Sequence, residues 1–252
     1  MYSMVHTSSR VVVGGLLALA LAPAAWSQQV IQNGSFEADA AVIQSPVPFT
    51  AWTAAENGIL GGVAINKGTI APASGAATVG ASDGKNYAVL DLAQPSQMAL
   101  WQTFSIGAQP VASATLSFKW FANYSGAETA FIHGPQGLDY NSSDDVLTFR
   151  VDILKAGASA FSTAASDLAF SALLNAPLSG GPNPYLGFSQ NVSGLVAGET
   201  YSLRFAAAAN RGQLAVGIDN VALTVSPVPE PSAWALMAAG LSFVAFAIRR
   251  RA

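Results

Sequence analysis

The sequence contains no cysteine, and this absence removes several kinds of chemistry. The chain has no disulfide, no thiolate metal site, no cysteine nucleophile and no haem attachment motif. Of its two histidines, only His133 lies outside the first 27 residues. No Gly-x-Ser-x-Gly sequence stands between a strand pattern and a helix pattern, and His-Glu-x-x-His does not occur. The sequence therefore argues against a serine hydrolase and excludes a zinc protease of that type.

Charged residues are also scarce. They make up 10% of the chain, whereas ordinary soluble domains carry about 25%. Between residues 28 and 226, seven basic residues stand against thirteen acidic ones, so phosphate backbones would be repelled. These values exclude a charge-rich disordered protein and a nucleic-acid-binding protein.

The N-terminus has the three parts of a secretory signal peptide. Arg10 precedes an apolar run over residues 11–22, and Pro23 and Ala25-Trp26-Ser27 follow. We predict a signal peptide over residues 1–27 with cleavage after Ser27, and cleavage after Ala24 as the second choice. The alternative, an uncleaved membrane helix, is disfavoured because twelve apolar residues are too few to cross a hydrocarbon core of about 30 Å.

The C-terminus carries a second apolar segment. Residues 233–248 contain no charge, and Arg249, Arg250 and Arg251 follow them. As a helix this segment would be about 24 Å long, and it would span a membrane if the arginines extend toward the interface. Basic residues stay on the cytoplasmic side, so the preceding domain would lie outside. Before the segment, Pro229-Glu230-Pro231 forbids helix and favours an extended backbone that an enzyme can bind.

These three parts, in this order and at the extreme C-terminus, resemble the PEP-CTERM sorting signal of Gram-negative bacteria. The resemblance covers residues 228–252, and we assign residues 227–252 to this tail. It implies recognition of Pro229, Glu230 and Pro231 by an exosortase, a membrane cysteine transpeptidase, followed by delivery to the cell envelope or the extracellular polysaccharide matrix. A plain C-terminal membrane anchor with a proline-rich stalk is the alternative, and it also places the domain outside the inner membrane.

Residues 28–226 show the period-2 alternation of β-strands and almost no helical periodicity. Strand patterns cover residues 87–92, 99–106, 115–120, 147–153, 201–205 and 214–225. In the last of these the apolar parity shifts by one residue at Asp219-Asn220, which predicts a β-bulge. Residues 58–84, 124–145, 157–171 and 176–187 are predicted loops, and residues 164–174 could form one short helix. The pattern predicts a single all-β domain, an antiparallel β-sandwich.

The two ends of this domain resemble galactose-binding-like jelly rolls, which include many carbohydrate-binding modules. The resemblance lies in Asn33-Gly34-Ser35-Phe36-Glu37, in Trp52 and in residues 217–223. It implies adjacent first and last strands and a structural calcium ion held by Glu37 and Asp219. Oxygen ligands suit Ca²⁺, and a bulge frees backbone carbonyls. In the alternative interpretation Glu37 caps a turn and Asp219 binds backbone amides.

Aromatic side chains are candidates for sugar stacking, although most lie in apolar strands. Trp52, Trp101, Phe104, Phe118 and Tyr201 are predicted to lie in the core. Trp120 and Phe121 are consecutive and must face opposite sides of their strand, so one of them could be exposed. Tyr124, Tyr140 and Tyr185 lie in polar segments and complete the candidate set.

Together these observations predict an exported, non-enzymatic β-sandwich that associates with extracellular polysaccharide. A calcium-stabilised carbohydrate-binding module is the main alternative. A glycoside hydrolase is less favoured. Such an enzyme needs only two facing carboxylates, but no pair stands out among the thirteen acidic residues.

Overall fold

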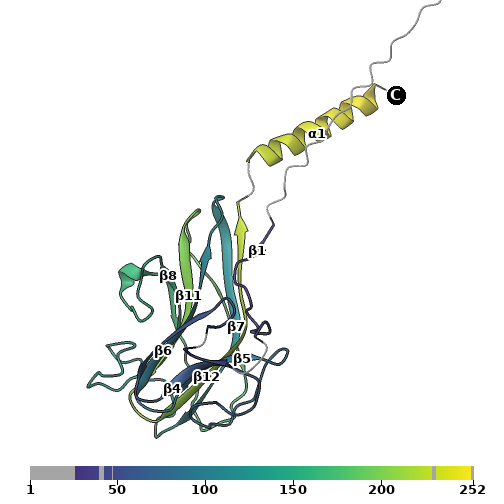
Figure 1. Ribbon diagram of the computed structural model, residues 1–252. Coiled ribbons are helices and arrows are strands. Elements are labelled where there is room, and N and C mark those ends of the chain that lie inside the picture. The colour runs from purple at the N-terminus through teal and green to yellow at the C-terminus, as the bar shows by residue number, and fades with distance from the viewer. Residues whose placement is uncertain (1–25, 40–42, 47, 229–230, 251–252) are drawn as a thin grey trace, which may run out of the picture. The chain divides into compact units, whose positions relative to one another are not determined.

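The computed structural model describes residues 26–39, 43–46, 48–228 and 231–250 (Figure 1). The chain divides into two units, Trp26–Val228 and a unit that combines Met1–Ala25 with Pro229–Ala252. The first unit holds the strands, and the second holds helix α1 (Pro231–Arg249). The predicted signal peptide lies outside the described residues except for Trp26 and Ser27.

The strands form two antiparallel sheets, as the alternating pattern predicts. The first sheet has the order β10-β7-β12-β5-β4-β2, with β1 also paired to β12, and the second has the order β3-β6-β11-β8-β9. Figure 1 labels β1, β4, β5, β7 and β12 of the first sheet and β6, β8 and β11 of the second. The strands are β1 (Gln28–Gln29), β2 (Ile43–Gln44), β3 (Thr53–Gly58), β4 (Gly61–Asn66), β5 (Tyr87–Leu92), β6 (Ser96–Ser105), β7 (Val111–Ser125), β8 (Leu147–Lys155), β9 (Leu168–Leu173), β10 (Leu186–Asn191), β11 (Thr200–Ala209) and β12 (Gln213–Pro227).

The main core lies between the two sheets, where alternate side chains of facing strands meet. Trp52 packs beside Phe36 and Phe205, with ring centroids 5.4 Å and 6.1 Å apart. The core predictions for Trp52, Phe104, Phe118 and Tyr201 are confirmed, because all four side chains are buried in this cluster.

The outer faces of both sheets are covered as well. Phe121 packs against Tyr87 on the outer face of the first sheet. On the outer face of the second sheet, Leu138 and Val146 cover the alanines of β6 and β11. Long segments between strands therefore pack as additional layers, and the inner strands β5, β8 and β11 are almost wholly buried, whereas β3 and β10 remain largely exposed.

Two predicted loops contain strands. β4 lies within residues 58–84, and β9 begins within residues 157–171. The short helix predicted over residues 164–174 is wrong: this segment has one 3₁₀ turn, Ala165–Asp167, and then β9, which pairs with β8. Pairing to β8 overrides the weak helical preference of its alanines and leucines.

The predicted bulge in β12 is confirmed. The register against β7 shifts between Asp219 and Ala222, and Asn220 has a φ of 54°. β1 pairs with the C-terminal end of β12, so the first and last strands lie together as the jelly-roll resemblance implies. Asp219 is the last residue that pairs with β7 before the bulge, opposite Lys119, and Asn220 and Val221 are left out of the register.

Candidate functional site

The carboxylates of Glu37 and Asp219 bind one loop, residues 82–86. Asp219 Oδ2 accepts hydrogen bonds from the backbone N–H groups of Ser82 (2.7 Å) and Asp83 (3.0 Å). Glu37 Oε1 accepts from the N–H groups of Lys85 (2.8 Å) and Asn86 (2.6 Å). The two residues that the sequence singled out therefore act on the same segment, although 182 positions separate them in the chain.

Close backbone packing brings the two ends of the domain to this loop. The Val221 N–H donates to Gly34 O at 2.9 Å. A Cβ atom on Gly34 would lie 1.9 Å from Val221 O, so no larger residue fits there without movement. Glycine at position 34 is what allows the segment before Glu37 to lie directly on the β12 bulge.

Backbone amides satisfy both carboxylates, as the second interpretation of these residues requires. Asp219 Oδ1 also accepts from the N–H of Asn220 at 2.7 Å. Burial nevertheless raises the pKa of Asp219 to about 6, because loss of solvent outweighs these three hydrogen bonds and Asp83 adds negative charge nearby.

The same loop has an unsatisfied acceptor. The Asn86 side-chain amide donates to Phe36 O and Asp39 O, both at 2.8 Å, while its Oδ1 is buried without a hydrogen-bond partner among the described residues. An excess of acceptor oxygens and a desolvated carboxylate are features that fit a hard cation. In the described part of the chain, however, no three His, Cys, Asp or Glu side chains are grouped closely enough to hold a metal ion, so calcium would also need backbone or amide oxygens.

The structure places three of the five candidate aromatics away from solvent. Trp120 and Phe121 do face opposite sides of β7, but Trp120 packs in the main core and Phe121 is covered by Tyr185. Tyr124 is also buried, with its hydroxyl 2.5 Å from Glu128 Oε2. The expectation that one of Trp120 and Phe121 is exposed is wrong, because loops cover the outer face of the sheet. Tyr140 and Tyr185 are half-buried.

Trp101 was predicted to lie in the core and instead lies on the outer face of the second sheet. It is half-buried and packs against the buried cluster that contains Ala99 and Leu138. Thr103 follows on the same face of β6 and is exposed. A partly exposed indole beside a hydroxyl is a surface on which a sugar ring could stack, as was expected at Trp120 or Phe121.

A polar groove of about 490 Å³ adjoins this surface. β3 pairs with β6 only as far as Trp101, so the edge of β6 is open beyond that residue. The backbone of Ile106 bonds toward β11, and by alternation the polar backbone groups of Thr103 and Ser105 point to the open edge. The groove is lined by Gln28, Gln29, Val30, Gln32, Ala51, Gln102, Thr103, Phe104 and Ser105.

Two hydrogen bonds between Gln32 and Gln102 join the two walls of the groove. The Gln32 N–H donates to Gln102 Oε1 at 2.7 Å, and Gln102 Nε2 donates to Gln32 O at 2.8 Å. The Gln28 and Gln32 side chains are exposed. None of the lining side chains carries a charge, so the groove offers neutral donors and acceptors only.

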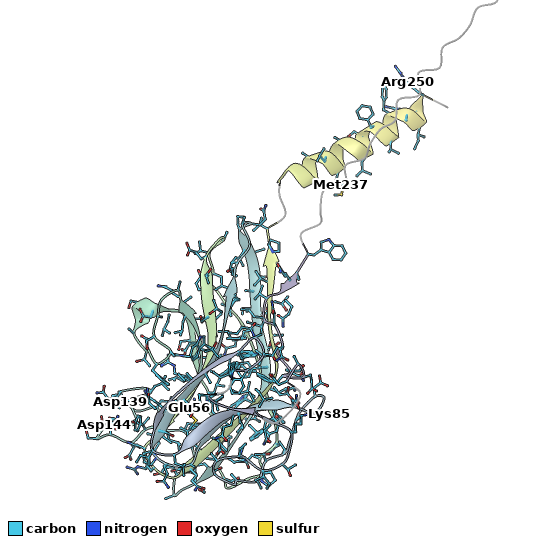
Figure 2. All side chains as sticks on the ribbon, in the orientation of Figure 1. Glu56, Lys85, Asp139, Asp144, Met237 and Arg250 are labelled. Carbon is cyan, nitrogen blue, oxygen red and sulfur yellow. The ribbon has the colours of Figure 1, made fainter. Side chains whose placement is uncertain are left out.

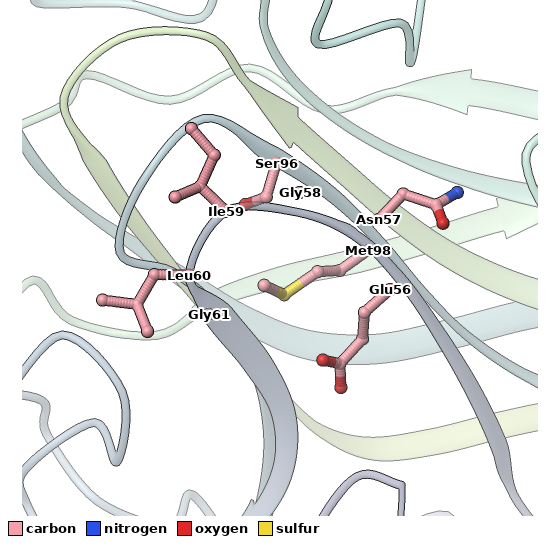
Figure 3. Close-up of a pocket in the computed structure, with 8 residues that line it drawn as sticks. All are labelled: Glu56, Asn57, Gly58, Ile59, Leu60, Gly61, Ser96 and Met98. Atoms are coloured by element: carbon pink, nitrogen blue, oxygen red, sulfur yellow. The ribbon is translucent and has the colours of Figure 1, made fainter.

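A second, smaller pocket of about 240 Å³ lies at the hairpin that joins β3 and β4. Figure 3 shows Ile59 and Leu60 at the turn, with Glu56 and Met98 along the strands. Glu56 is its only carboxylate, and Glu56 Oε1 accepts from the Val63 N–H at 3.0 Å. This carboxylate holds the hairpin, and the pocket supplies no pair of acids for glycoside hydrolysis.

The acidic loop around Asp139 and Asp144 lies at the edge of the domain (Figure 2). Asp139 Oδ1 accepts from the Asn141 N–H at 3.0 Å, which is the pattern of a local turn. His133 lies in a loop, where Nε2 is 2.8 Å from Asn175 Oδ1.

The second sheet carries a buried ion network that no sequence pattern predicts. Asp152 lies between Arg150 and Arg204, and all three side chains are buried. Arg204 Nη1 also donates to Ala160 O (2.7 Å) and Ser162 O (2.8 Å), which holds the segment after β8 on the sheet. These charged residues alternate with apolar ones along β8 and β11, a pattern that is usual for a solvent-exposed face. Only the covering segment makes that face buried.

The tail forms a helix where the sequence predicts one. α1 contains residues 233–248 and ends at Arg249, and the Arg250 guanidinium lies 4.8 Å from the Phe246 ring centroid. In the part of the chain that the structure describes, no helix is long and apolar enough to cross a membrane. Pro229, Glu230 and Arg251 lie outside the described residues. The expectation of an extended backbone is wrong at Pro231, which is the first residue of the helix. Proline is tolerated there because the N–H that it lacks would have no partner within the helix.

Comparison with known families identifies this tail. The model of the PEP-CTERM protein-sorting motif matches residues 227–251. The tail is a PEP-CTERM motif. The match confirms the resemblance found in the sequence, and it implies export by the exosortase pathway of Gram-negative bacteria. No curated protein matches the chain in sequence.

Solved structures resemble the domain at low identity. A Stig cyclase, Fisc, from Fischerella sp. TAU is 18% identical, with a TM-score of 0.51 over 81% of this chain and 100% of that chain. The carbohydrate-binding module TmCBM61, solved with β-1,4-galactotriose, is 11% identical, with a TM-score of 0.44 over 78% and 97% of the two chains. A CBM4 structure is 20% identical, with a TM-score of 0.42 over 79% and 99%. The similarity to the cyclase shows the fold alone.

Proposed function

We propose that this protein is a non-enzymatic polysaccharide-binding protein, and that its PEP-CTERM motif delivers it to the cell envelope or the extracellular matrix. The motif match at residues 227–251 carries the delivery part of the proposal. An exosortase-type membrane enzyme would recognise Pro229, Glu230 and Pro231 and process the chain near them. Arg249, Arg250 and Arg251 would hold the tail at the cytoplasmic side.

We also propose that α1 contacts the membrane before processing. Its large apolar side chains, including Leu241, Phe243 and Ile248, are exposed. A helix that is apolar on all sides needs lipid or protein around it. The uncharged stretch 233–248 and the arginines that follow support lipid as that surrounding.

The groove at the β6 edge is the best candidate for the polysaccharide site. Sugar hydroxyls both donate and accept hydrogen bonds, and the exposed amides of Gln28 and Gln32 and the hydroxyls of Thr103 and Ser105 do the same. Trp101 offers a partly exposed ring next to them for stacking on a sugar face. The absence of charge among the lining residues favours a neutral glycan. The groove volume of about 490 Å³ lies within the range of about 300–1,000 Å³ that is usual for ligand sites.

The same lining supports binding without catalysis. No histidine, carboxylate, lysine or cysteine lines the groove. The hydroxyls of Thr103 and Ser105 therefore have no general base among the lining residues to activate them as nucleophiles. A sugar chain held there would be bound and left intact.

Calcium at the loop of residues 82–86 is a separate part of the proposal. Glu37, Asp219 and the buried Oδ1 of Asn86 would contribute oxygen ligands, together with backbone carbonyls. The ion would neutralise the desolvated Asp219 carboxylate and stabilise the fold. It would have no role in the groove.

Binding to a panel of neutral glycans tests the proposed function. The purified domain, residues 28–228, should bind at least one, and calorimetry should show binding weakened about 2- to 13-fold by Thr103→Val, the range expected for loss of one hydrogen bond. Trp101→Ala should have a larger effect. Thr115→Val on the first sheet is the matched control and should bind as the wild type does. Equal affinities for all variants, or no neutral glycan bound, would reject the site.

A further inference from the structure

The PEP-CTERM motif begins inside the folded domain. The match starts at Pro227, which is also the last residue of β12. Val228 still belongs to the domain, because its N–H donates to Pro110 O at 2.8 Å. Only Val228, Pro229 and Glu230 separate β12 from the first residue of α1. The recognition motif therefore follows the strand without a linker.

Partners on both sides hold the end of β12. On β7, Ser226 pairs with Ser113 and Pro227 pairs with Val111. On β1, Gln28 pairs with Val225, and Ser27 Oγ lies 2.7 Å from Ser226 Oγ. We call residues 225–228 with these partners the strand-end clasp.

An enzyme that cleaves a peptide chain binds several residues of it in an extended form, and it needs their backbone groups to be free. In the clasp, the backbone groups just before the motif are already bonded to β7, β1 and Pro110. Binding of the enzyme on this side of the motif must therefore compete with the end of the sheet.

We infer that the strand-end clasp limits processing of the PEP-CTERM tail, so that residues 226–228 must detach from β7 before the chain is cleaved. This inference rests on the proposed processing of the tail. Detachment can be local, because Pro227 has no N–H to donate and the register already shifts between Ser226 and Pro227. The remainder of β12, from Gln213 to Val225, stays paired while the end opens.

A reversible cross-link tests the clasp in the full chain. Ser113→Cys with Ser226→Cys joins two residues that pair directly across β7 and β12, and the Cα spacing of about 5.5 Å in such pairs suits a disulfide. The chain has no other cysteine, so no competing disulfide can form. Ser125→Cys with Gln213→Cys is the matched control, since these residues pair across the same two strands at their other end.

Processing is followed by pulse–chase labelling in a host that carries the exosortase. The 113–226 cross-link should slow tail removal at least about tenfold under oxidising conditions, and reductant should restore it. The 125–213 cross-link should leave the rate unchanged. Insertion of Gly-Ser-Gly-Ser between Val228 and Pro229 should accelerate processing of the wild type and rescue the 113–226 variant, because the linker supplies free backbone.

The outcomes separate this inference from the function on which it rests. If the wild type is processed and the oxidised 113–226 variant is processed at the same rate, the clasp does not limit processing and the inference is wrong. A slow rate that persists in reductant would also contradict it, since the substitutions and not the cross-link would then be the cause. If the wild type is never processed, the proposed function itself fails.

Discussion

Replacement of Asp152 by asparagine should destabilise the domain strongly. Asp152 accepts hydrogen bonds from Arg150 Nε (2.8 Å to Oδ2) and Nη2 (2.6 Å to Oδ1), and from Arg204 Nε (3.1 Å) and Nη2. Asparagine keeps the shape but removes the only negative charge between two buried guanidinium groups. Burial already lowers the pKa of Arg204, and Asp152 is the group that opposes this effect.

Loss of one partner from a buried ion pair costs about 3–5 kcal/mol, because the remaining charge is left uncompensated. A domain has about 5–15 kcal/mol of stability in total. With a urea dependence of about 2 kcal/mol per molar, the unfolding midpoint should fall by about 1.5–2.5 M. Urea titration of the domain, followed by circular dichroism, measures this shift.

Asp145→Asn is the matched control, because it makes the same chemical change at an exposed ion pair with Arg211. It should cost no more than about 1 kcal/mol. Replacement of the whole network by Arg150→Met, Asp152→Leu and Arg204→Met should recover much of the stability that Asp152→Asn loses. An Asp152→Asn variant within about 0.5 kcal/mol of the wild type would refute the reasoning, since surface substitutions have effects of that size.

Three further predictions concern the loop of residues 82–86 and the packing beneath it. Without calcium, the contribution of Asp219 to the free energy of unfolding should fall as the pH rises from about 4 to about 6, because the folded Asp219, with its pKa of about 6, binds its proton more tightly than the unfolded group near 3.9. The wild type should therefore lose stability relative to Asp219→Asn over this range, and a difference between the two proteins that stays constant or grows in favour of the wild type would contradict the prediction. Calcium at a hundredfold excess over its Kd should add about 2.7 kcal/mol of stability at pH 7, and this gain should vanish in Asp219→Asn. If neither EDTA nor calcium changes the melting curve of the wild type, Glu37 and Asp219 serve only to hold the loop. Gly34→Ala should cost about 1–3 kcal/mol of stability, because the added Cβ would meet Val221 O. Gly107→Ala should not destabilise the domain, because a Cβ there meets nothing within 4 Å. Equal melting temperatures for the two variants would count against the close approach of Gly34 to Val221.

The β-sandwich could be predicted from the sequence because period-2 alternation records directly which side chains face the core. Residues 87–92 coincide with β5, and the parity shift at Asp219 located the bulge in β12. β4 and β9 escaped detection for a physical reason. β4 starts with two glycines, and β9 consists largely of half-buried small and apolar residues whose strand pairing depends on a neighbour far away in sequence.

The candidate site could be predicted only in part from the sequence. The motifs around Glu37 and Asp219 marked two residues that do meet one loop, but the donors on that loop are backbone amides with no sequence signature. Alternation gave the correct opposite orientation of Trp120 and Phe121, yet it could not show that Tyr185 and the loop before β5 cover Phe121. The groove depends on where β3 stops pairing with β6, and no local pattern in either strand shows that limit.

The central claim is that the domain reaches the cell exterior through a tail that is recognised and removed. The most direct test is the intact mass of the protein released from cells that carry the exosortase, for the wild type and for a variant with Pro229, Glu230 and Pro231 replaced by alanine. We predict that the released wild type lacks the arginine cluster and most of α1, and that the variant stays full-length in the membrane fraction. Release of a chain that still carries Arg249 and Arg250, or release of the variant to the same extent as the wild type, would contradict the account.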